Sequence, residues 1–277
     1  MMKKLLCLII IAFVANSAYA GFPIGRGKYL LVPSYNLYTT KGYWDAGGTY
    51  VPFSNGGRFA SHYFGIYGGI GIGERLDFVG NISYIMQRKL ETNLAQSNSS
   101  FGDASFGLSY LLNTFDYSKF LNVTGSLIVP LYTNDASKQP FTGFQQVGGE
   151  VKFTYSGSNG ERYSNTYFDI NLGVRQYFSP EGPTQIFGDA LLGIPLDEDN
   201  KLTFQLASTK SSSTQTGLVL NPNNLFLNRQ FNYFRLTAGY GRKISQKYQI
   251  FLSVFTDVNG RNTGKGGGGS ISLVGEL

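Results

Sequence analysis

The sequence predicts an all-β fold, a transmembrane antiparallel up-and-down β-barrel of about twelve strands. Three observations indicate it. Many segments alternate apolar and polar residues, as strands do when one face meets lipid and the other a lumen. No segment after the N-terminus offers the roughly 18 consecutive apolar residues of a membrane-spanning helix. Short and long connections alternate between the segments, as they do between the two ends of such barrels.

Residues 1–20 are predicted to be a signal peptide. Lys3 and Lys4 precede an apolar run at residues 5–14, and residues 18–20 read Ala-Tyr-Ala, a small-x-small cleavage signal. The apolar run is too short for a spanning helix, which needs roughly 20 residues. We therefore expect export through the periplasm, with the cell outer membrane as the destination.

The predicted mature chain, residues 21–277, contains no cysteine, because Cys7 lies in the signal peptide. This excludes a disulfide framework and a cysteine metal site. The net charge of +6 falls to about +4 without the two signal-peptide lysines, and no basic block is longer than two residues. We expect no nucleic-acid partner, because such binding normally needs a clustered basic face.

Composition alone leaves a soluble β-sandwich or soluble β-barrel open. The chain has 36 Gly, 22 Phe and 19 Tyr, with only 14% charged residues. Abundant Phe and Tyr suit the aromatic girdles of a membrane barrel. The polar faces of the segments are short and rich in Gly, Ser, Thr and Asn, whereas a soluble protein would carry lysines and glutamates on its outward face.

Residues 168–178 alternate most clearly. Phe168, Ile170 and Leu172 share one face, and Asp169 and Asn171 lie on the other. Counts of ten or fourteen strands remain open, because the first two segments and the last alternate less cleanly. The twelve expected strands are centred near residues 33, 66, 82, 107, 125, 150, 171, 189, 206, 238, 253 and 273.

The connections support the same topology, with both termini on the periplasmic side. The expected short turns are at residues 73–75, 113–118, 157–162, 197–200 and 245–247. The expected longer outer loops are at residues 39–58, 88–100, 132–143, 211–230 and 258–265. One outer connection, residues 179–183, is short and breaks the pattern.

The polar phase of the strands defines a predicted lumen. Its four acids and three bases are nearly balanced, which argues against a strongly ion-selective open porin. Pairing of these charges across neighbouring strands is favoured over a role as substrate ligands, and the hypothesis is that Asp103, Glu150, Asp169 and Arg175 line a constriction. The full set of predicted lumen-lining residues is Asp103, Glu150, Lys152, Asp169, Arg175, Asp189, Arg235 and Phe251.

Some positions on the luminal phase are apolar, namely Ile128, Phe187, Phe251 and Phe255. They indicate either a path for apolar or aromatic molecules or packing that fills a small barrel.

Two motifs are interpreted as structural. His62, the only histidine, follows Ser61, but adjacent strand residues point to opposite faces, so the two cannot easily form a hydrolytic pair. Residues 69–73, Gly-Ile-Gly-Ile-Gly, precede another strand and not the helix that a nucleotide-binding loop requires. Residues 266–269, four glycines, are expected to be a flexible approach to the last strand, and residues 221–224 a turn in an outer loop.

Residues 70–112 carry a family resemblance. The turn Gly73-Glu74-Arg75-Leu76-Asp77 and the signature Gly102-Asp103 opening a later strand are similar to those of the outer-membrane transporters associated with meta-pathway phenol degradation. These are distant relatives of the channels for hydrophobic compounds of the fatty acid and toluene type. Gly27-Lys28-Tyr29, followed by an aromatic loop, looks similar too.

The resemblance implies an outer-membrane channel for passive uptake of small hydrophobic or aromatic compounds. We expect no enzymatic step and no cofactor, outer-membrane lipid and a small hydrophobic molecule as partners, and a monomer more than an obligate oligomer. Two departures matter. Only about six residues precede the first strand, where the fatty acid transporters carry a plug domain, and Leu277 replaces the usual terminal Phe or Trp.

The rival interpretation is a structural or adhesive barrel with a closed lumen and functional outer loops. Tyr43, Trp44, Tyr50 and Phe53 would be its contact surface. A third interpretation, a lipid hydrolase, would require a serine close to His62.

Overall fold

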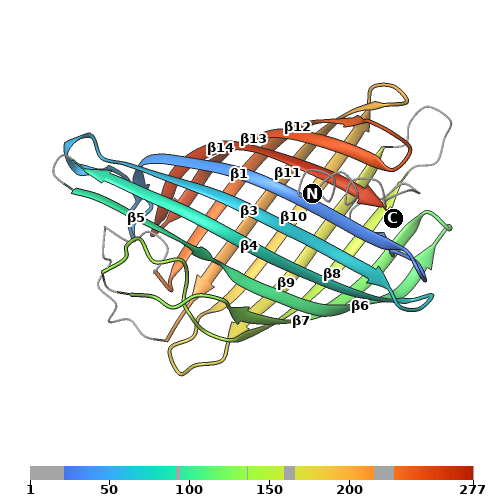
Figure 1. The fold of residues 1–277 in the computed structure, drawn as a ribbon, viewed down its shortest axis with the longest axis horizontal. Coiled ribbons are helices and arrows are strands. Elements are labelled where there is room, and N and C mark those ends of the chain that lie inside the picture. The colour runs from blue at the N-terminus through green and yellow to red at the C-terminus, as the bar shows by residue number, and fades with distance from the viewer. Residues whose placement is uncertain (1–21, 92–93, 136, 159–165, 215–227, 277) are drawn as a thin grey trace, which may run out of the picture.

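The computed structural model describes residues 22–276 apart from 92–93, 136, 159–165 and 215–227 (Figure 1). The predicted signal peptide, the predicted turn at 221–224, most of the predicted turn at 157–162 and Leu277 therefore lie outside the described residues. No helix in the described part of the chain is long and apolar enough to cross a bilayer.

Twelve strands form a closed antiparallel barrel, as the sequence predicts (Figure 1). Each strand pairs with its neighbours in the chain, and β14 pairs with β1 to close the barrel. The barrel strands are β1 (Tyr29–Trp44), β3 (Arg58–Gly71), β4 (Leu76–Glu91), β6 (Asp103–Phe115), β7 (Lys119–Pro130), β8 (Gly148–Ser158), β9 (Tyr167–Tyr177), β10 (Thr184–Pro195), β11 (Asn200–Ser212), β12 (Phe231–Lys243), β13 (Tyr248–Arg261) and β14 (Thr263–Glu276). Three short elements lie outside the ring of twelve, namely β2 (Tyr50–Pro52), the 3-10 helix η1 (Ser54–Gly56) and β5 (Leu94–Phe101).

The outer surface of the barrel is apolar and the inner surface is more polar. Leu172 and Val254 are 61% and 66% exposed on the outside, whereas Asp169 and Asp257 are 4% and 5% exposed on the inside. A soluble monomer rarely exposes apolar patches larger than a few hundred Å². The inverted distribution matches a barrel that shows its apolar face to lipid.

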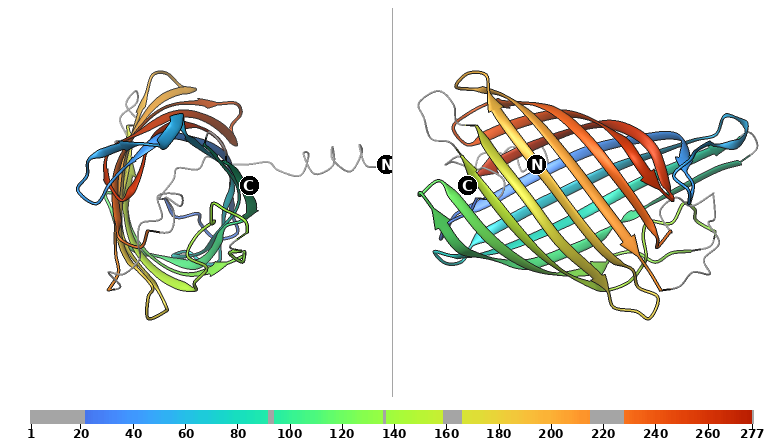
Figure 2. Two further views of the ribbon diagram at one scale, coloured as in Figure 1. Left: turned by 90° about the vertical axis from the view of Figure 1, so that its left-hand side faces the viewer. Right: turned by 180° about the vertical axis from the view of Figure 1, so that it is seen from behind.

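Both described ends of the chain lie at the same end of the barrel (Figure 2). The four short turns that the structure describes at this end match the prediction, and in the β6–β7 turn Asp116 and Tyr117 have positive φ angles of 51° and 53°. The short β9–β10 connection at the other end is also confirmed, since β9 ends at Tyr177 and β10 begins at Thr184.

Three predicted outer loops are partly strand. β1 continues to Trp44 and pairs with β2, β4 continues to Glu91 and pairs with β5, and β13 continues to Arg261, where Asn262 alone makes the turn into β14. The physical reason is that a strand above the lipid keeps its backbone hydrogen bonds but no longer needs an apolar face. The alternation that predicts strands therefore stops before the strands do.

The four consecutive glycines, predicted to be a flexible approach, lie within β14. Gly268 is paired with Tyr38 of β1 on one side and Phe255 of β13 on the other. The two rings are nearly parallel, with centroids 6.4 Å apart. Aromatic side chains from neighbouring strands thus cover the backbone that glycine leaves bare, as in other sheets where an aromatic ring rescues a cross-strand glycine.

Candidate functional site: the barrel lumen

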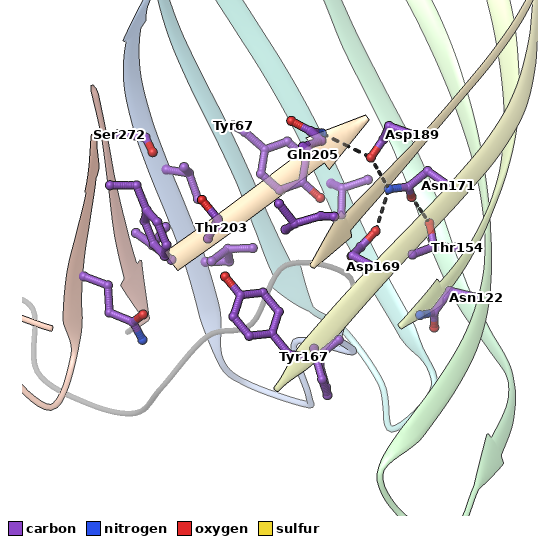
Figure 3. Close-up of a pocket in the computed structure, with 18 of the residues that line it drawn as sticks. Tyr67, Asn122, Thr154, Tyr167, Asp169, Asn171, Asp189, Thr203, Gln205 and Ser272 are labelled. Carbon is purple, nitrogen blue, oxygen red and sulfur yellow. Dashed lines mark hydrogen bonds between the residues drawn. The ribbon is translucent and has the colours of Figure 1, made fainter. Parts of the chain in front are cut away.

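The lumen holds a cavity of about 510 Å³ in the half of the barrel nearer the termini. Its lining comes from strands all around the barrel and from the segment before β1. Figure 3 shows side chains from opposite walls pointing into the same space.

One wall of the cavity, built by β7 to β11, is polar. Asn171 stands at its centre, where its amide nitrogen donates to Asp169 at 2.5 Å and to Asp189 at 3.2 Å (Figure 3). Thr154 donates to the amide oxygen of Asn171 at 2.6 Å, and Gln205 donates to Asp189 at 3.2 Å. The network holds both carboxylates against the wall of the barrel.

The facing wall is mainly apolar. It is formed by β14, β1, β3 and β4 together with the segment before β1. The apolar and aromatic residues that line it are Phe22, Ile24, Leu30, Val32, Tyr67, Val79 and Val274. The cavity therefore offers hydrogen bonds on one side and apolar surface on the other.

Residues 22–28 fold into the barrel and form part of the cavity floor. In the end-on view of Figure 2, the blue start of the described chain lies inside the ring of strands. The Ile24 N–H donates to the Asp77 carboxylate at 3.0 Å, and the Phe22 ring packs edge-on against Phe120 with centroids 5.2 Å apart. The sequence indicated no plug, because so few residues precede the first strand. The structure shows that even this short segment narrows the lumen.

Two glycines of β3 make room for this segment. A Cβ atom on Gly71 would lie 1.8 Å from the Gly25 carbonyl oxygen, and one on Gly69 would lie 2.4 Å from the Ile24 side chain. Gly71 also exchanges backbone hydrogen bonds with the segment, accepting from the N–H of Gly27 at 2.8 Å. Gly69 and Gly71 are two residues apart, so both lie on the inner face of β3, where residues 22–28 cross it. The structural role predicted for these glycines agrees with this contact.

The aromatic side chains inside the barrel lie over glycines of the neighbouring strand. Phe251 is paired with Gly241, and Tyr167 with Gly193. A Cβ atom on Gly241 would lie 2.4 Å from the Phe251 ring, and one on Gly193 would lie 2.0 Å from the Tyr167 ring. The rings therefore lie along the wall and do not fill the lumen. Phe187 over Gly173 repeats the arrangement.

Lys201 lies between two of these rings. Its ammonium is 5.3 Å from the centroid of Tyr167 and 5.9 Å from that of Phe251, and it donates to Gln249 at 2.7 Å. The cation and the ring faces attract each other. This contact helps to hold the rings against the wall.

The outer half of the lumen contains two ion pairs. Arg175 lies directly opposite Glu150 across β8 and β9, with a closest N–O distance of 2.6 Å. Arg235 binds Asp257 at 2.7 Å and lies 4.4 Å from the centroid of Phe255. Both arginines are therefore paired with an acid on the neighbouring strand, as the sequence analysis favoured.

Sequence reasoning missed Asp257, because residues 258–265 were taken to form a loop directly after it. Asp257 continues the inward phase of Ser253 and Phe255, and this phase could have identified it. Arg235 pairs with Asp257 in the regular register that begins at Lys243 and Gln249, and a β-bulge follows just beyond this pair.

The eight predicted lumen residues occupy different heights. Lys152, Asp169, Asp189 and Phe251 line the cavity. Arg175 is six residues beyond Asp169 on β9, roughly 20 Å at 3.3 Å per residue, so the four residues expected at a constriction do not form one ring. The remaining inward positions, nearer the outer end, are Asp103, Glu150, Arg175 and Arg235.

Ser61 and His62 point to opposite faces of β3, as expected. Ser61 is buried on the inner face, whereas His62 lies on the outer face, where its Nδ1 atom is 2.8 Å from the Tyr35 hydroxyl. No group of three or more metal-ligating side chains occurs among the described residues.

No family model and no curated protein matches this chain. An outer-membrane channel from Pseudomonas putida F1 is similar in structure, with a TM-score of 0.72 and 13% sequence identity over 95% of this chain and 100% of that chain.

The chain has an outer-membrane barrel fold. The NanC porin aligns with a TM-score of 0.52 and 7% identity, covering 89% of this chain and 100% of that one. The translocator domain of the autotransporter NalP from Neisseria meningitidis aligns with a TM-score of 0.50 and 10% identity, covering 99% and 94% of the two chains. At these identities the likeness shows the fold, and the resemblance to phenol-degradation transporters stays a prediction.

Proposed function

We propose that this protein is an outer-membrane channel for passive passage of small hydrophobic or aromatic compounds. The observation that carries the proposal is the cavity inside the closed barrel, with one apolar wall and with aromatic rings lying along its sides. Its volume of about 510 Å³ falls within the roughly 300–1,000 Å³ of small-molecule sites. The fold shared with an outer-membrane channel and a porin supports the same proposal.

The charges in the lumen favour a neutral cargo. Glu150 and Asp257 neutralise Arg175 and Arg235, and Asn171 links Asp169 to Asp189. Strong ion selectivity usually comes from rings of like charge. The lumen contains two ion pairs and a mixture of acids and bases, with no ring of like charge among its described residues.

The adhesive alternative is less well supported. Two of its expected contact residues, Trp44 and Phe53, are only 5% and 7% exposed, and the ammonium groups of Lys265 and Lys89 lie over their rings. A contact surface must present its aromatic side chains to a partner. Trp44 and Phe53 are too buried to do so. Tyr50 is 41% exposed and could still contact a partner.

Replacing Arg175 by Glu tests whether the lumen is the path. The substitution places two carboxylates directly opposite each other, which is unfavourable across a strand pair. We expect a several-fold shift of ion selectivity towards cations in planar bilayers and a change in the rate at which liposomes take up a hydrophobic dye. The exchanged pair Glu150→Arg with Arg175→Glu is the control, because it restores the ion pair. If the single variant conducts and takes up dye as the parent does, Arg175 does not line the path.

A further inference from the structure

Three basic side chains lie together on the outer surface of the barrel, away from the lumen. Lys41 lies between the buried residues Thr40 and Gly42 of β1, and Arg58 precedes the buried Phe59 of β3. Arg88 lies between two buried residues of β4. All three are exposed, and the alternation of their strands turns them outward.

The strand register brings the three cations into one patch. Thr40 pairs with Phe59, which places Lys41 next to Arg58 on the adjacent strand. Ala60 pairs with Arg88, so Arg88 lies diagonally across from Arg58. Side chains directly opposite each other are about 5 Å apart at Cβ, and diagonal neighbours about 7–8 Å. Ala60 and Leu90 occupy the other two positions of the square that Arg58 and Arg88 form across the two strands.

No described acid neutralises the patch. β1, β3 and β5 contain no acidic residue at all. β4 contains two acids: Asp77 faces the lumen near the opposite end, where it binds the Ile24 N–H, and Glu91 is the last residue of the strand, with a side chain outside the described part of the structure. None of the ion pairs among the described residues includes Lys41, Arg58 or Arg88.

The patch lies directly above the apolar band of the barrel. On the outer face of this wall, β3 presents Ile70, Ile66 and Phe64 and then His62. The stretch from His62 to Ile72 is eleven residues long, which matches the about 9–11 residues a tilted strand needs to cross the hydrocarbon. Arg58 and Arg88 come immediately after this stretch. They therefore lie at the level of lipid headgroups.

We propose that Lys41, Arg58 and Arg88 form a binding site for the phosphate groups of an outer-leaflet lipid. The proposal rests on the proposed placement of the chain in an outer membrane with its termini in the periplasm. Arginine binds phosphate through paired, charge-assisted hydrogen bonds, and lysine adds a point charge. A phosphorylated headgroup would supply the anions that the patch lacks, while its acyl chains would cover the apolar band below.

The test is lipid binding by the full mature chain in detergent, measured by native mass spectrometry. The probes are lipid A with both phosphates and the same lipid without phosphate. We expect the parent chain to retain phosphorylated lipid A, and the triple variant Lys41→Gln, Arg58→Gln and Arg88→Gln to lose roughly ten-fold or more in affinity. The matched control is Lys210→Gln, because Lys210 is an exposed cation on the outer face of β11, another wall.

Each outcome decides the proposal. It is overturned if the triple variant retains lipid A as the parent does, if Lys210→Gln loses as much, or if lipid without phosphate binds equally well. A resistance to unfolding in dodecyl sulfate equal to that of the parent shows that the triple variant is folded. The channel conductance of the triple variant is expected to equal that of the parent. Lipid binding therefore tests the lipid site, and conductance tests the channel proposal.

Discussion

Deleting residues 22–27, which follow the predicted signal peptide, is expected to raise single-channel conductance several-fold. Phe22 and Ile24 line the cavity, and their segment crosses the lumen on the inner face of β3. An apolar constriction limits the passage of water and ions, so removal of this segment widens the lumen at the cavity floor. The measurement is single-channel recording in planar bilayers, with the parent chain and the deletion variant purified alike.

A point substitution gives the same test without altering the N-terminus. In Gly71→Val the new side chain would occupy the position of the Gly25 carbonyl, so the segment must leave its place. Gly125→Val is the matched control, because a Cβ atom at Gly125 meets nothing within 4 Å. If Gly71→Val and the deletion both leave conductance at the parent value, the segment does not restrict the path.

Replacing Gly241 by Val is expected to reduce the uptake of small aromatic compounds several-fold. The Cβ atom would lie 2.4 Å from the Phe251 ring, which must then turn from the wall into the cavity. Overpacking of this kind typically costs about 1–3 kcal/mol, which leaves the barrel intact. Uptake by liposomes that contain the purified chain measures the effect, and unfolding in urea measures the stability.

A second substitution separates a blocked path from a damaged barrel. Adding Phe251→Ala to Gly241→Val removes the displaced ring and is expected to restore uptake. Gly125→Val again serves as the control for a larger side chain elsewhere in the wall. Equal uptake by parent and Gly241→Val would show that the compounds do not pass this ring.

The fold was predictable wherever the strands cross lipid. In residues 168–178 the membrane demands apolar residues on one face, so the sequence repeats with period two. Outside the lipid this demand ends, and the ends of β1, β4 and β13 were taken for loops. Gly268 was misjudged for a related reason, since its partners Tyr38 and Phe255 come from strands far away in the sequence.

The site was predictable in its faces but not in its contacts. Alternation places Asp169 and Arg175 on the inner face, yet the Asn171 network and the Asp257 partner of Arg235 depend on strand register. The floor formed by residues 22–28 could not be predicted from their number alone. The glycines on the inner face of β3 were the available signal, because glycine often marks the close approach of another backbone.

Uptake of a small aromatic hydrocarbon by living cells tests the central claim most directly. Cells whose outer membrane contains this chain are compared with cells that lack it and with cells that contain Gly241→Val, at equal amounts of folded barrel. The proposed channel predicts uptake several-fold faster with the parent chain, lost in Gly241→Val and regained when Phe251→Ala is added. Equal uptake by all of these cells, with the barrel correctly inserted, would contradict it.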